Sequence, residues 1–496
     1  MIGESPAIIV TLLLISLLAL SIDVQPVIAS ENVYIRVDGS VDPPSSNIST
    51  EDNITYTFTD NLLNKSVVVE RSNIIIDGSG FKLEGEGSGK GFHLIASDIT
   101  IRNTRITGFT YGMFFGGVMG QEIINNEIAN TYTGIRIDGW SWDNRIADNE
   151  IFDNVFGIDL RLESIATIIN NNITNNHWGI YHSEWCGSWG GEIIGNFIAN
   201  NGVGIDLSEV TCLLRDNQLI NSSLAVTGFD MGHYNHDIDT SNTIDGKPIY
   251  FWKNQLDRKI PPDAGYITLV GCRNITVENL VMTGNDVGVR LVDTTDSRVR
   301  NIAIIDTPFG IHLVSSFNNS IYSNNITDCA FPFSLFETAG NEIYHNNIMG
   351  DYDLPWVYFS GDLWDSGYPV GGNYWEQYNG SDLYLGVNQN VEGSDGICDT
   401  PYISDVFNGD VNFTDRYPLM EPWTPSWEPI LPILTGDVNF DCVVDIFDVV
   451  RVASIYEHTS SDPKWDSYCD LAEAYGLIDI FDIVVVASHY GEEYSP

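Results

Sequence analysis

A repeat of roughly 22 residues constrains the fold of this chain more than any other sequence feature. Between residues 91 and 205 a glycine followed by an apolar residue recurs at intervals of 21, 22, 23, 22 and 25 residues, and the pair returns at 288 and 310. Within each repeat, short alternating stretches rich in Ile and Val are separated by Gly, Asn and Asp, which is typical of strands and tight turns. Three short strands in such a repeat predict one coil of a parallel β-helix.

Equivalent residues of neighbouring coils should stack about 4.8 Å apart. We expect Ile135, Ile158, Ile180 and Ile205 to form an aliphatic ladder inside the coil. An asparagine keeps the same period, and stacked amides can bond to each other and to nearby main chain at a turn. The repeating residues are Asn126, Asn149, Asn171, Asn196, Asn217, Asn279, Asn301, Asn324 and Asn346.

The residue two positions after each glycine should point outward, which aligns Arg136, Asp159, Tyr181 and Asp206 on consecutive coils. Asp159 and Asp206 are then two coils apart, roughly 9–10 Å, at the upper edge of the separation used by inverting glycosidases. Asp159, Asp206 and Arg136 are therefore candidate catalytic residues, with Arg161 as a second basic candidate. Acids on exposed strands are common in so acidic a chain, so a purely structural role is the alternative.

Aromatic residues gather near the same strand. Indole and phenol rings offer flat apolar faces on which sugar C–H groups stack. These aromatic residues predict a glycan-binding groove. The alternative is that their side chains pack over the flank of the coil and cover it. The candidates are Trp140, Trp142, Trp178, Tyr181, Trp185 and Trp189.

The C-terminal region contains a second repeat, because residues 446–454 return almost unchanged at 480–488. Oxygen-bearing residues before and within the first copy occupy offsets 1, 3, 5, 9 and 12 of a calcium-binding loop, with a main-chain carbonyl at offset 7. The second loop has an extra residue and two alanines, which predicts a weaker site. The expected ligands are Asp437, Asn439, Asp441, Val443, Asp445 and Asp448 in the first loop and Asp470, Asp479 and Asp482 in the second.

The chain carries 68 acidic and 22 basic residues, a net charge of −46, which argues against nucleic acid or anionic membrane as partners. Residues 8–20 form an apolar run that is too short to span a bilayer and suits the core of a signal peptide. We therefore expect a secreted or cell-surface protein with no transmembrane anchor in its mature chain.

The duplicated segment 436–492 resembles a type I dockerin, a small helical domain with EF-hand-like calcium loops. The resemblance implies a cohesin domain of a scaffold or surface protein as partner. It assigns the cohesin-binding role to the residues that follow the loops, Ile446, Phe447, Ile480 and Phe481.

The 22-residue repeats resemble the NosD-like right-handed parallel β-helices, a pectin-lyase-like fold with PbH1-type repeats that includes polysaccharide-acting domains. The segments 239–250, 372–375 and 393–402 carry this resemblance, and the first is typical of archaeal members. The NosD name suggests copper, for which only His233, His236 and Asp237 are compactly spaced. His182 falls at an inward position, where a core role is expected.

These features predict a mainly β, multimodular exported protein. It docks through a calcium-dependent dockerin to a cohesin and presents a β-helix that recognises polysaccharide. The alternatives are a polysaccharide lyase or glycoside hydrolase and, last, a NosD-type copper-associated protein. The expected segments are a signal peptide (1–29), an N-terminal cap (30–69), the β-helix (70–350), its C-terminal part (351–420), a Pro-rich linker (421–435) and the dockerin (436–492).

Overall fold

The computed structural model describes residues 31–183, 189–228, 231–403, 406–407, 410–411, 413–424 and 477–490, with isolated positions between 444 and 472. The chain divides into two compact units, one ending at Gly202 and the other beginning at Val203. Among the described residues, no helix has both the length and the apolar character that a membrane span requires.

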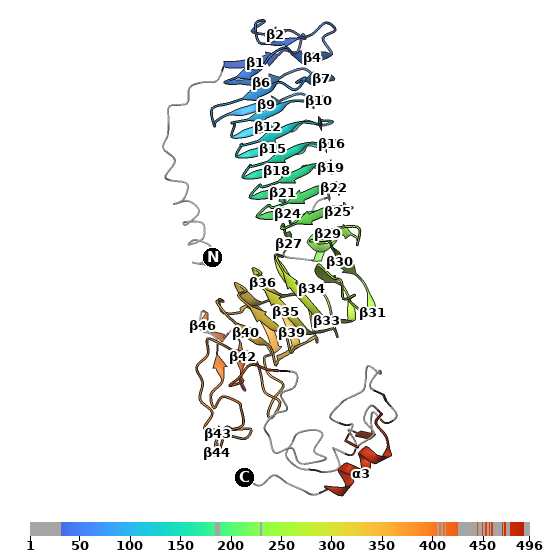
Figure 1. The fold of residues 1–496 in the computed structure, drawn as a ribbon, viewed down its shortest axis with the longest axis vertical. Helices are drawn as coiled ribbons and strands as arrows, with labels where there is room; N and C mark the ends of the chain where they lie inside the picture. Colours follow the sequence, from blue (N-terminus) through green and yellow to red (C-terminus); the bar gives the residue numbers. More distant parts are fainter. Residues whose placement is uncertain are drawn as a thin grey trace. The chain divides into compact units, whose positions relative to one another are not determined.

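The first unit is a parallel β-helix with three strands per coil, as predicted (Figure 1). Its first sheet contains β1 (Glu31–Ile35), β6 (Lys65–Val69), β9 (Lys90–Leu94), β12 (Tyr111–Gly116), β15 (Thr133–Asp138), β18 (Phe156–Arg161) and β21 (Trp178–Ser183). The second contains β4 (Thr55–Phe58), β7 (Ile74–Asp77), β10 (Ile99–Arg102), β13 (Glu122–Ile124), β16 (Asn144–Ala147), β19 (Ala166–Ile169) and β22 (Trp189–Ile194). The third contains β5 (Leu62–Leu63), β8 (Lys82–Glu84), β11 (Arg105–Thr107), β14 (Glu127–Ala129), β17 (Glu150–Phe152), β20 (Asn172–Thr174) and β23 (Phe197–Ala199).

Antiparallel pairings protect the first coil of this unit. Strand β2 (Val41–Asp42) pairs with β1, and β3 (Ile48–Ser49) pairs with β4. Because an open parallel edge exposes unpaired main-chain groups, these short strands blunt it against pairing with another chain.

The second unit is also built of coils. Its first coils contain β24 (Val203–Ser208), β25 (Thr211–Arg215), β26 (Gln218–Ile220), β27 (Leu224–Thr227), β28 (Asp237–Ile238) and β29 (Thr243–Ile244), with the short helix η2 (Met231–Tyr234). One parallel sheet then runs through β30 (Lys247–Lys253), β32 (Tyr266–Val270), β34 (Val287–Val292), β36 (Phe309–Val314), β39 (Phe331–Tyr344) and β41 (Trp356–Leu363). The remaining strands are β31 (Leu256–Lys259), β33 (Arg273–Thr283), β35 (Arg298–Ile305), β37 (Ser320–Tyr322), β38 (Asn325–Thr327), β40 (Asn347–Met349) and β42 (Tyr374–Trp375).

Small antiparallel hairpins follow the coils, and the C-terminal region contains one described helix. The hairpins pair β43 (Tyr384–Leu385) with β44 (Val391–Glu392), β45 (Tyr402–Ile403) with β48 (Thr414–Asp415), and β46 (Val406–Phe407) with β47 (Asp410–Val411). The helix is α3 (Ile480–Ser488).

The aliphatic ladder lies inside the coils, as expected. In the first unit the strand register places Ile135 beside Ile158 and Ile158 beside Ile180. These three side chains, and Ile205 in the second unit, are fully buried. The repeating isoleucine therefore supplies the core of the coil.

A chain of side-chain amides runs along the first unit beside this core. Nδ2 of Asn126 donates to Oδ1 of Asn149 at 3.0 Å, Asn149 to Asn171 at 2.9 Å and Asn171 to Asn196 at 3.0 Å. Each oxygen also accepts a main-chain N–H, as Asn149 does from the nitrogen of Asn126 at 2.9 Å. Aspartate has no N–H to donate, so it cannot continue such a ladder.

The same arrangement joins Asn324, Asn346 and Asn373 in the second unit, but Asn279 and Asn301 lie outside the ladder. Both are exposed and have positive φ angles of 61° and 51°. The ladder position belongs to the next residue, because the nitrogen of Ile302 donates to Oδ1 of Asn324 at 3.1 Å. These two amides do bond to each other, since Nδ2 of Asn301 donates to Oδ1 of Asn279, but they do so at an exposed left-handed turn position, which asparagine also favours.

Removing one amide should destabilise the first unit. Asn149→Ala leaves the main-chain N–H and the side-chain Nδ2 of Asn126 without their acceptor. We therefore expect the free energy of unfolding to fall by about 2–3 kcal/mol. Denaturant unfolding followed by tryptophan fluorescence measures the change. Glu150→Ala, at the exposed neighbouring position, should stay within about 0.5 kcal/mol of the wild type. Equal losses in both variants would show that the ladder contributes no special stability.

Candidate functional site

The outer face of the first sheet carries a row of polar and aromatic residues. The strand register aligns His93 with Phe114, Phe114 with Arg136, Arg136 with Asp159 and Asp159 with Tyr181. The predicted succession Arg136–Asp159–Tyr181 is therefore confirmed as geometry, while the roles of these residues stay predictions.

Two of these residues form an ion-pair network with two neighbours on the same strands, and we define the network as Arg136, Asp138, Asp159 and Arg161. Nη2 of Arg136 lies 2.8 Å from Oδ1 of Asp138, and its Nη1 contacts Oδ2 of Asp159. Nε of Arg161 lies 2.9 Å from Oδ1 of Asp159. The Asp159 side chain is only 1% exposed and both of its oxygens are engaged. This environment favours a structural role for Asp159 over attack on a substrate.

Aromatic rings lie beside the network and form a ring cluster of Phe156, Trp178 and Tyr181. Phe156 and Trp178 stack in parallel, with centroids 4.6 Å apart and planes 6° apart. Tyr181 meets Phe156 edge-on at 5.6 Å, and the guanidinium of Arg161 lies 5.1 Å from the Tyr181 ring. The exposed Tyr132 lies 5.9 Å from Phe156. These contacts fix the orientation of the rings before any ligand arrives.

Two members of this aromatic group, Phe156 and Tyr132, were not predicted from the sequence. Phe156 and Trp178 each directly precede a repeating glycine. The position before the glycine, compared from coil to coil, would have predicted that the two rings stack. Two predicted residues, Trp140 and Trp142, lie in the turn after β15 and are 67% and 42% exposed. Trp185 lies outside the described residues, and Trp189 is described only as the first residue of β22.

The N-terminal end of the same face carries a cation. Nζ of Lys90 lies 3.5 Å from the centre of the Phe114 ring and 3.2 Å from Nε2 of His93. Burial lowers the pKa of Lys90, and burial together with the nearby ammonium lowers the pKa of His93. Polar and aromatic groups therefore continue along the face over several coils.

Asp206 belongs to the second unit and has a different environment from Asp159. It lies on β24, where Oγ of Ser208 donates to it at 2.9 Å. Burial raises the pKa of Asp206 to about 6, and the Ser208 bond opposes this rise while the charge of Asp286 adds to it. Such a carboxyl group can hold or release a proton near neutral pH, which is what a general acid requires.

An ion pair close to Asp206 contains a buried arginine. Nη2 of Arg290 lies 2.7 Å from Oδ2 of Asp286, and its Nη1 donates to the Tyr266 hydroxyl at 2.8 Å. The Arg290 side chain is 1% exposed. A charge buried to this degree is tolerated because it is paired and hydrogen-bonded.

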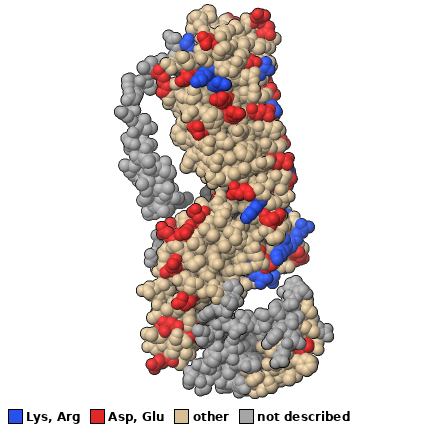
Figure 2. Space-filling model, viewed as in Figure 1, with Lys and Arg blue, Asp and Glu red and all other residues tan. Residues whose placement is uncertain are grey.

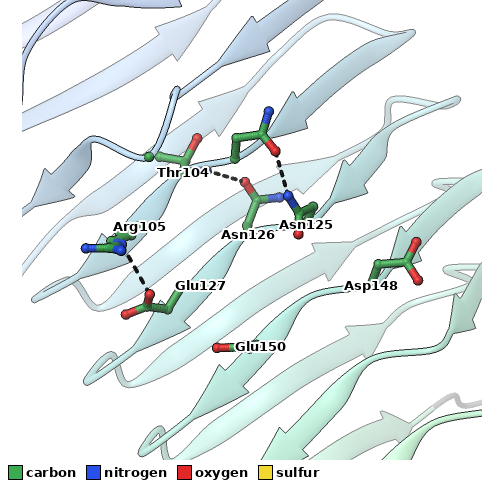
Figure 3. Close-up of a pocket in the computed structure, with 9 residues that line it drawn as sticks. Thr104, Arg105, Asn125, Asn126, Glu127, Asp148 and Glu150 are labelled. Atoms are coloured by element: carbon green, nitrogen blue, oxygen red, sulfur yellow. Dashed lines mark hydrogen bonds and ion pairs between the residues drawn. The ribbon is translucent and has the colours of Figure 1, made fainter.

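A polar pocket of about 290 Å³ opens on another side of the first unit (Figure 3). Arg105 and Glu127 point toward each other across its floor, at 3.3 Å. The rest of the lining is formed by Gly80, Asn103, Thr104, Asn125, Asn126, Asp148 and Glu150. Its lining contains no aromatic ring, so it lacks the stacking surface of the ring cluster.

The described histidines do not converge on a metal. Nδ1 of His236 accepts the main-chain N–H of Cys212 at 3.2 Å, and His345 stacks on Trp423 at 3.5 Å. Burial and the neighbouring arginine lower the pKa of His312 to about 3. His182 is 1% exposed and aligned with Leu160, which confirms the predicted core histidine. Over the described part of the chain, no three His, Cys, Asp or Glu side chains form a metal-binding group.

The duplicated C-terminal segment has a small hydrophobic core of its own. Val444, Val452, Cys469, Ile478 and Val486 are fully buried. Val444 and Ile478 are 34 residues apart, and so are Val452 and Val486. Equivalent positions of the two copies therefore share one core, as expected for a duplicated module.

Most of the predicted calcium ligands lie outside the described residues: Asp437, Asn439, Asp441, Val443, Asp445, Asp448 and Asp470. Asp479 caps helix α3 by accepting from the nitrogen of Phe481 at 2.7 Å. The buried Asp482 accepts main-chain N–H groups of Leu471, Ala472 and Asp479 at 2.6, 2.8 and 2.7 Å. Asp482 thus holds the main chain of Leu471 and Ala472 close to the start of helix α3.

The predicted partner-binding residues are only partly described. Ile480 and Phe481, in the first turn of α3, are 52% and 63% exposed, and Val484 beside them is 54% exposed. Ile446 and Phe447 lie outside the described residues. The helix therefore presents apolar side chains that its own module leaves exposed.

The coils, the buried amide ladders and the exposed face define a parallel β-helix protein. The model of the NosD family, described as periplasmic copper-binding protein (NosD), matches residues 30–250 and 249–380. These matches cover more than half of the chain, which therefore belongs to the NosD family. No curated protein matches the chain. The family description names copper, but the described residues contain no group of three His or Cys ligands of the kind that copper prefers.

The environment of Asp206 predicts a pH-dependent stability. Its pKa is higher in the folded chain, about 6, than the ordinary value of 3.8, so ionisation costs folding free energy. The cost is absent below pH 3.8, grows toward pH 6 and is constant above. Asp206→Asn should therefore raise the free energy of unfolding by about 1–2 kcal/mol at pH 7.5 and leave it unchanged near pH 3.5.

Thermal unfolding of both proteins between pH 3.5 and 8 measures this effect. Asp351→Asn, at an exposed position, should reproduce the wild-type profile. Parallel profiles for Asp206→Asn and the wild type would show that Asp206 ionises normally in the folded chain.

Proposed function

We propose that this protein is an exported β-helix module that recognises glycans on the outer face of its first sheet. Its duplicated C-terminal module would hold it on a partner in a calcium-dependent way. The observation that carries the proposal is the ring cluster of Phe156, Trp178 and Tyr181, fixed beside the ion-pair network. The family match supports export, because the printed description of the family is periplasmic.

The chemistry of this face suits sugars. Rings that are already stacked lose little conformational entropy on binding, and their flat surfaces accept sugar C–H groups. The ion-pair network balances two guanidinium groups with two carboxylates. Its hydrogen-bonding groups therefore serve sugar hydroxyls without favouring a strongly charged ligand. We infer a neutral glycan for this face.

The enzyme alternative has one specific observation in its favour. Asp206 has a pKa near 6, in the range of a general acid. Asp159, by contrast, is enclosed by Arg136 and Arg161. A lyase or hydrolase function would therefore depend on Asp206 alone and not on the predicted pair of Asp159 and Asp206.

The C-terminal module supports the tethering part of the proposal. The first loop has the complete ligand pattern of a calcium site in its sequence. The exposed Ile480 and Phe481 on α3 offer an apolar surface for a partner. A cohesin domain is the partner that the dockerin resemblance implies.

The glycan proposal predicts that truncating the central ring weakens binding. A glycan array identifies a ligand, and calorimetry then compares the wild type with Trp178→Ala. We expect at least a tenfold loss of affinity, about 1.4 kcal/mol, because the stacking surface is removed. Phe197→Ala, on the third sheet and 40% exposed, should bind as the wild type does.

An array without ligands, or equal affinity in Trp178→Ala, would refute glycan recognition by this face. Turnover assays on the array ligands separate the alternative. Products that form with the wild type and disappear in Asp206→Asn would establish an enzyme in place of a binding module.

The calcium proposal predicts one strong site. Calorimetric titration of the full chain should show that Asp437→Ala with Asp448→Ala abolishes tight calcium binding, because two carboxylate ligands are lost. Asp470→Ala should have a smaller effect. Two equal sites in the wild type would contradict the expected difference between the loops. Asp482→Asn should destabilise the module even without calcium, because its carboxylate accepts three main-chain N–H groups.

A further inference from the structure

Basic side chains gather on one part of the second unit, although the chain as a whole is strongly acidic. Residues 247–300 hold eight of the 22 Lys and Arg residues but only six of the 68 acids. Figure 2 shows these side chains together over the region where Figure 1 labels β31. We define the basic face as Arg258, Lys259, Arg273, Arg298 and Arg300, all of them exposed.

Two of these arginines are available for a ligand. Arg258 on β31 and Arg298 on β35 have no ion-pair partner within the described residues. The strand register aligns Lys259 with Thr276 and Thr276 with Arg298, so Lys259 and Arg298 are two coils apart on one face. That separation is roughly 9–10 Å. The cations are thus spaced out along the face.

A carboxylate lies among these cations. Glu278, on β33, contacts Nζ of Lys259, and its Oε2 lies 2.6 Å from Nε of Arg300. Burial acts to raise the pKa of Glu278, but the bonds to Lys259 and Arg300 lower it below its usual value. The ionised Glu278 therefore holds the side chains of Lys259 and Arg300 in place on this face.

Stacked tyrosines extend the same row. The register aligns Glu278 with Arg300, Arg300 with Tyr322 and Tyr322 with Tyr344. The rings of Tyr322 and Tyr344 are 5.2 Å apart and nearly parallel, at 9°. Nη1 of Arg300 donates to the Tyr322 hydroxyl at 3.2 Å. A flat aromatic surface thus adjoins the cations.

We propose that the basic face binds an anionic polysaccharide, one whose carboxylate or sulfate groups are separated by neutral sugar hydroxyls. The arginines and Lys259 pair with its anions, and the tyrosine pair stacks against a ring. This site lies in the second unit and stands independently of the neutral-glycan face of the first unit.

The spacing of charges favours such a ligand over nucleic acid. A phosphate backbone carries one charge per nucleotide and is bound by many cations acting together. Here Glu278 and Asp296, which pairs with Arg273 at 2.8 Å, lie among five cations and would repel dense phosphates. The net charge of −46 also opposes a long polyanion of high charge density.

The test compares binding of polygalacturonate, sparsely substituted carboxymethyl dextran and neutral dextran to the full chain at constant salt. We expect the wild type to bind the two anionic polymers and not dextran. Arg258→Glu with Arg298→Glu should lower affinity for both polyanions at least tenfold. Both residues are exposed, so the fold should be retained, which circular dichroism checks.

Two controls distinguish a site from a general charge effect. Arg258→Lys with Arg298→Lys should keep affinity within about threefold of the wild type, because charge is preserved. Lys82→Glu, a charge reversal at an exposed position of the first unit, should change it less than twofold. Trp178→Ala should leave polyanion binding intact, whether or not the neutral-glycan proposal holds.

Three results would overturn the proposal: no binding of either polyanion, an equal loss in Lys82→Glu, or equally tight binding of an oligothymidylate. The last would indicate a nonspecific anion surface or a nucleic-acid site.

Discussion

The stability of the coils depends on how each coil satisfies the main chain of its neighbour. Parallel strands meet this need along their length, but the turns between strands carry main-chain groups that no strand can pair. The buried amides do so, because one asparagine both accepts a main-chain N–H and donates to the next coil, as Asn149 does between Asn126 and Asn171. With these bonds in place, the isoleucine ladders can pack without leaving buried polar groups unsatisfied.

The functional surfaces follow from this rigidity. A strand register fixed by the ladder holds Phe156 against Trp178 and Arg136 against Asp159, so the face exists before a ligand is present. The same is true of Arg300 and the tyrosine pair in the second unit. Function on such a scaffold is set by which side chains project outward at a given coil.

Much of the fold could be predicted because a 22-residue period is visible without knowing any contact. The alignment of Arg136, Asp159 and Tyr181 followed from it directly. The enclosure of Asp159 did not, because it depends on Asp138 and Arg161, which project on the same face two residues away. The prediction placed Asn279 and Asn301 at the buried ladder position, but they occupy the exposed turn position directly before it, because asparagine is suited to both. Net charge concealed the basic face, because a sum over the chain says nothing about where the cations lie.

The amide ladder also has a direction. Each side chain donates toward the following coil, and two ladders of the second unit end at aspartates: Asn341 donates to Asp362 at 2.7 Å and Asn373 to Asp415 at 3.3 Å. A carboxylate, which only accepts hydrogen bonds, is sufficient at these ends, because no further coil follows to which it would have to donate. Each internal coil with an asparagine in the ladder therefore presents the same connection above and below. Whole coils can be added or lost by duplication or deletion while both ends keep their terminations, so the length of the protein can change in evolution without redesign of its core.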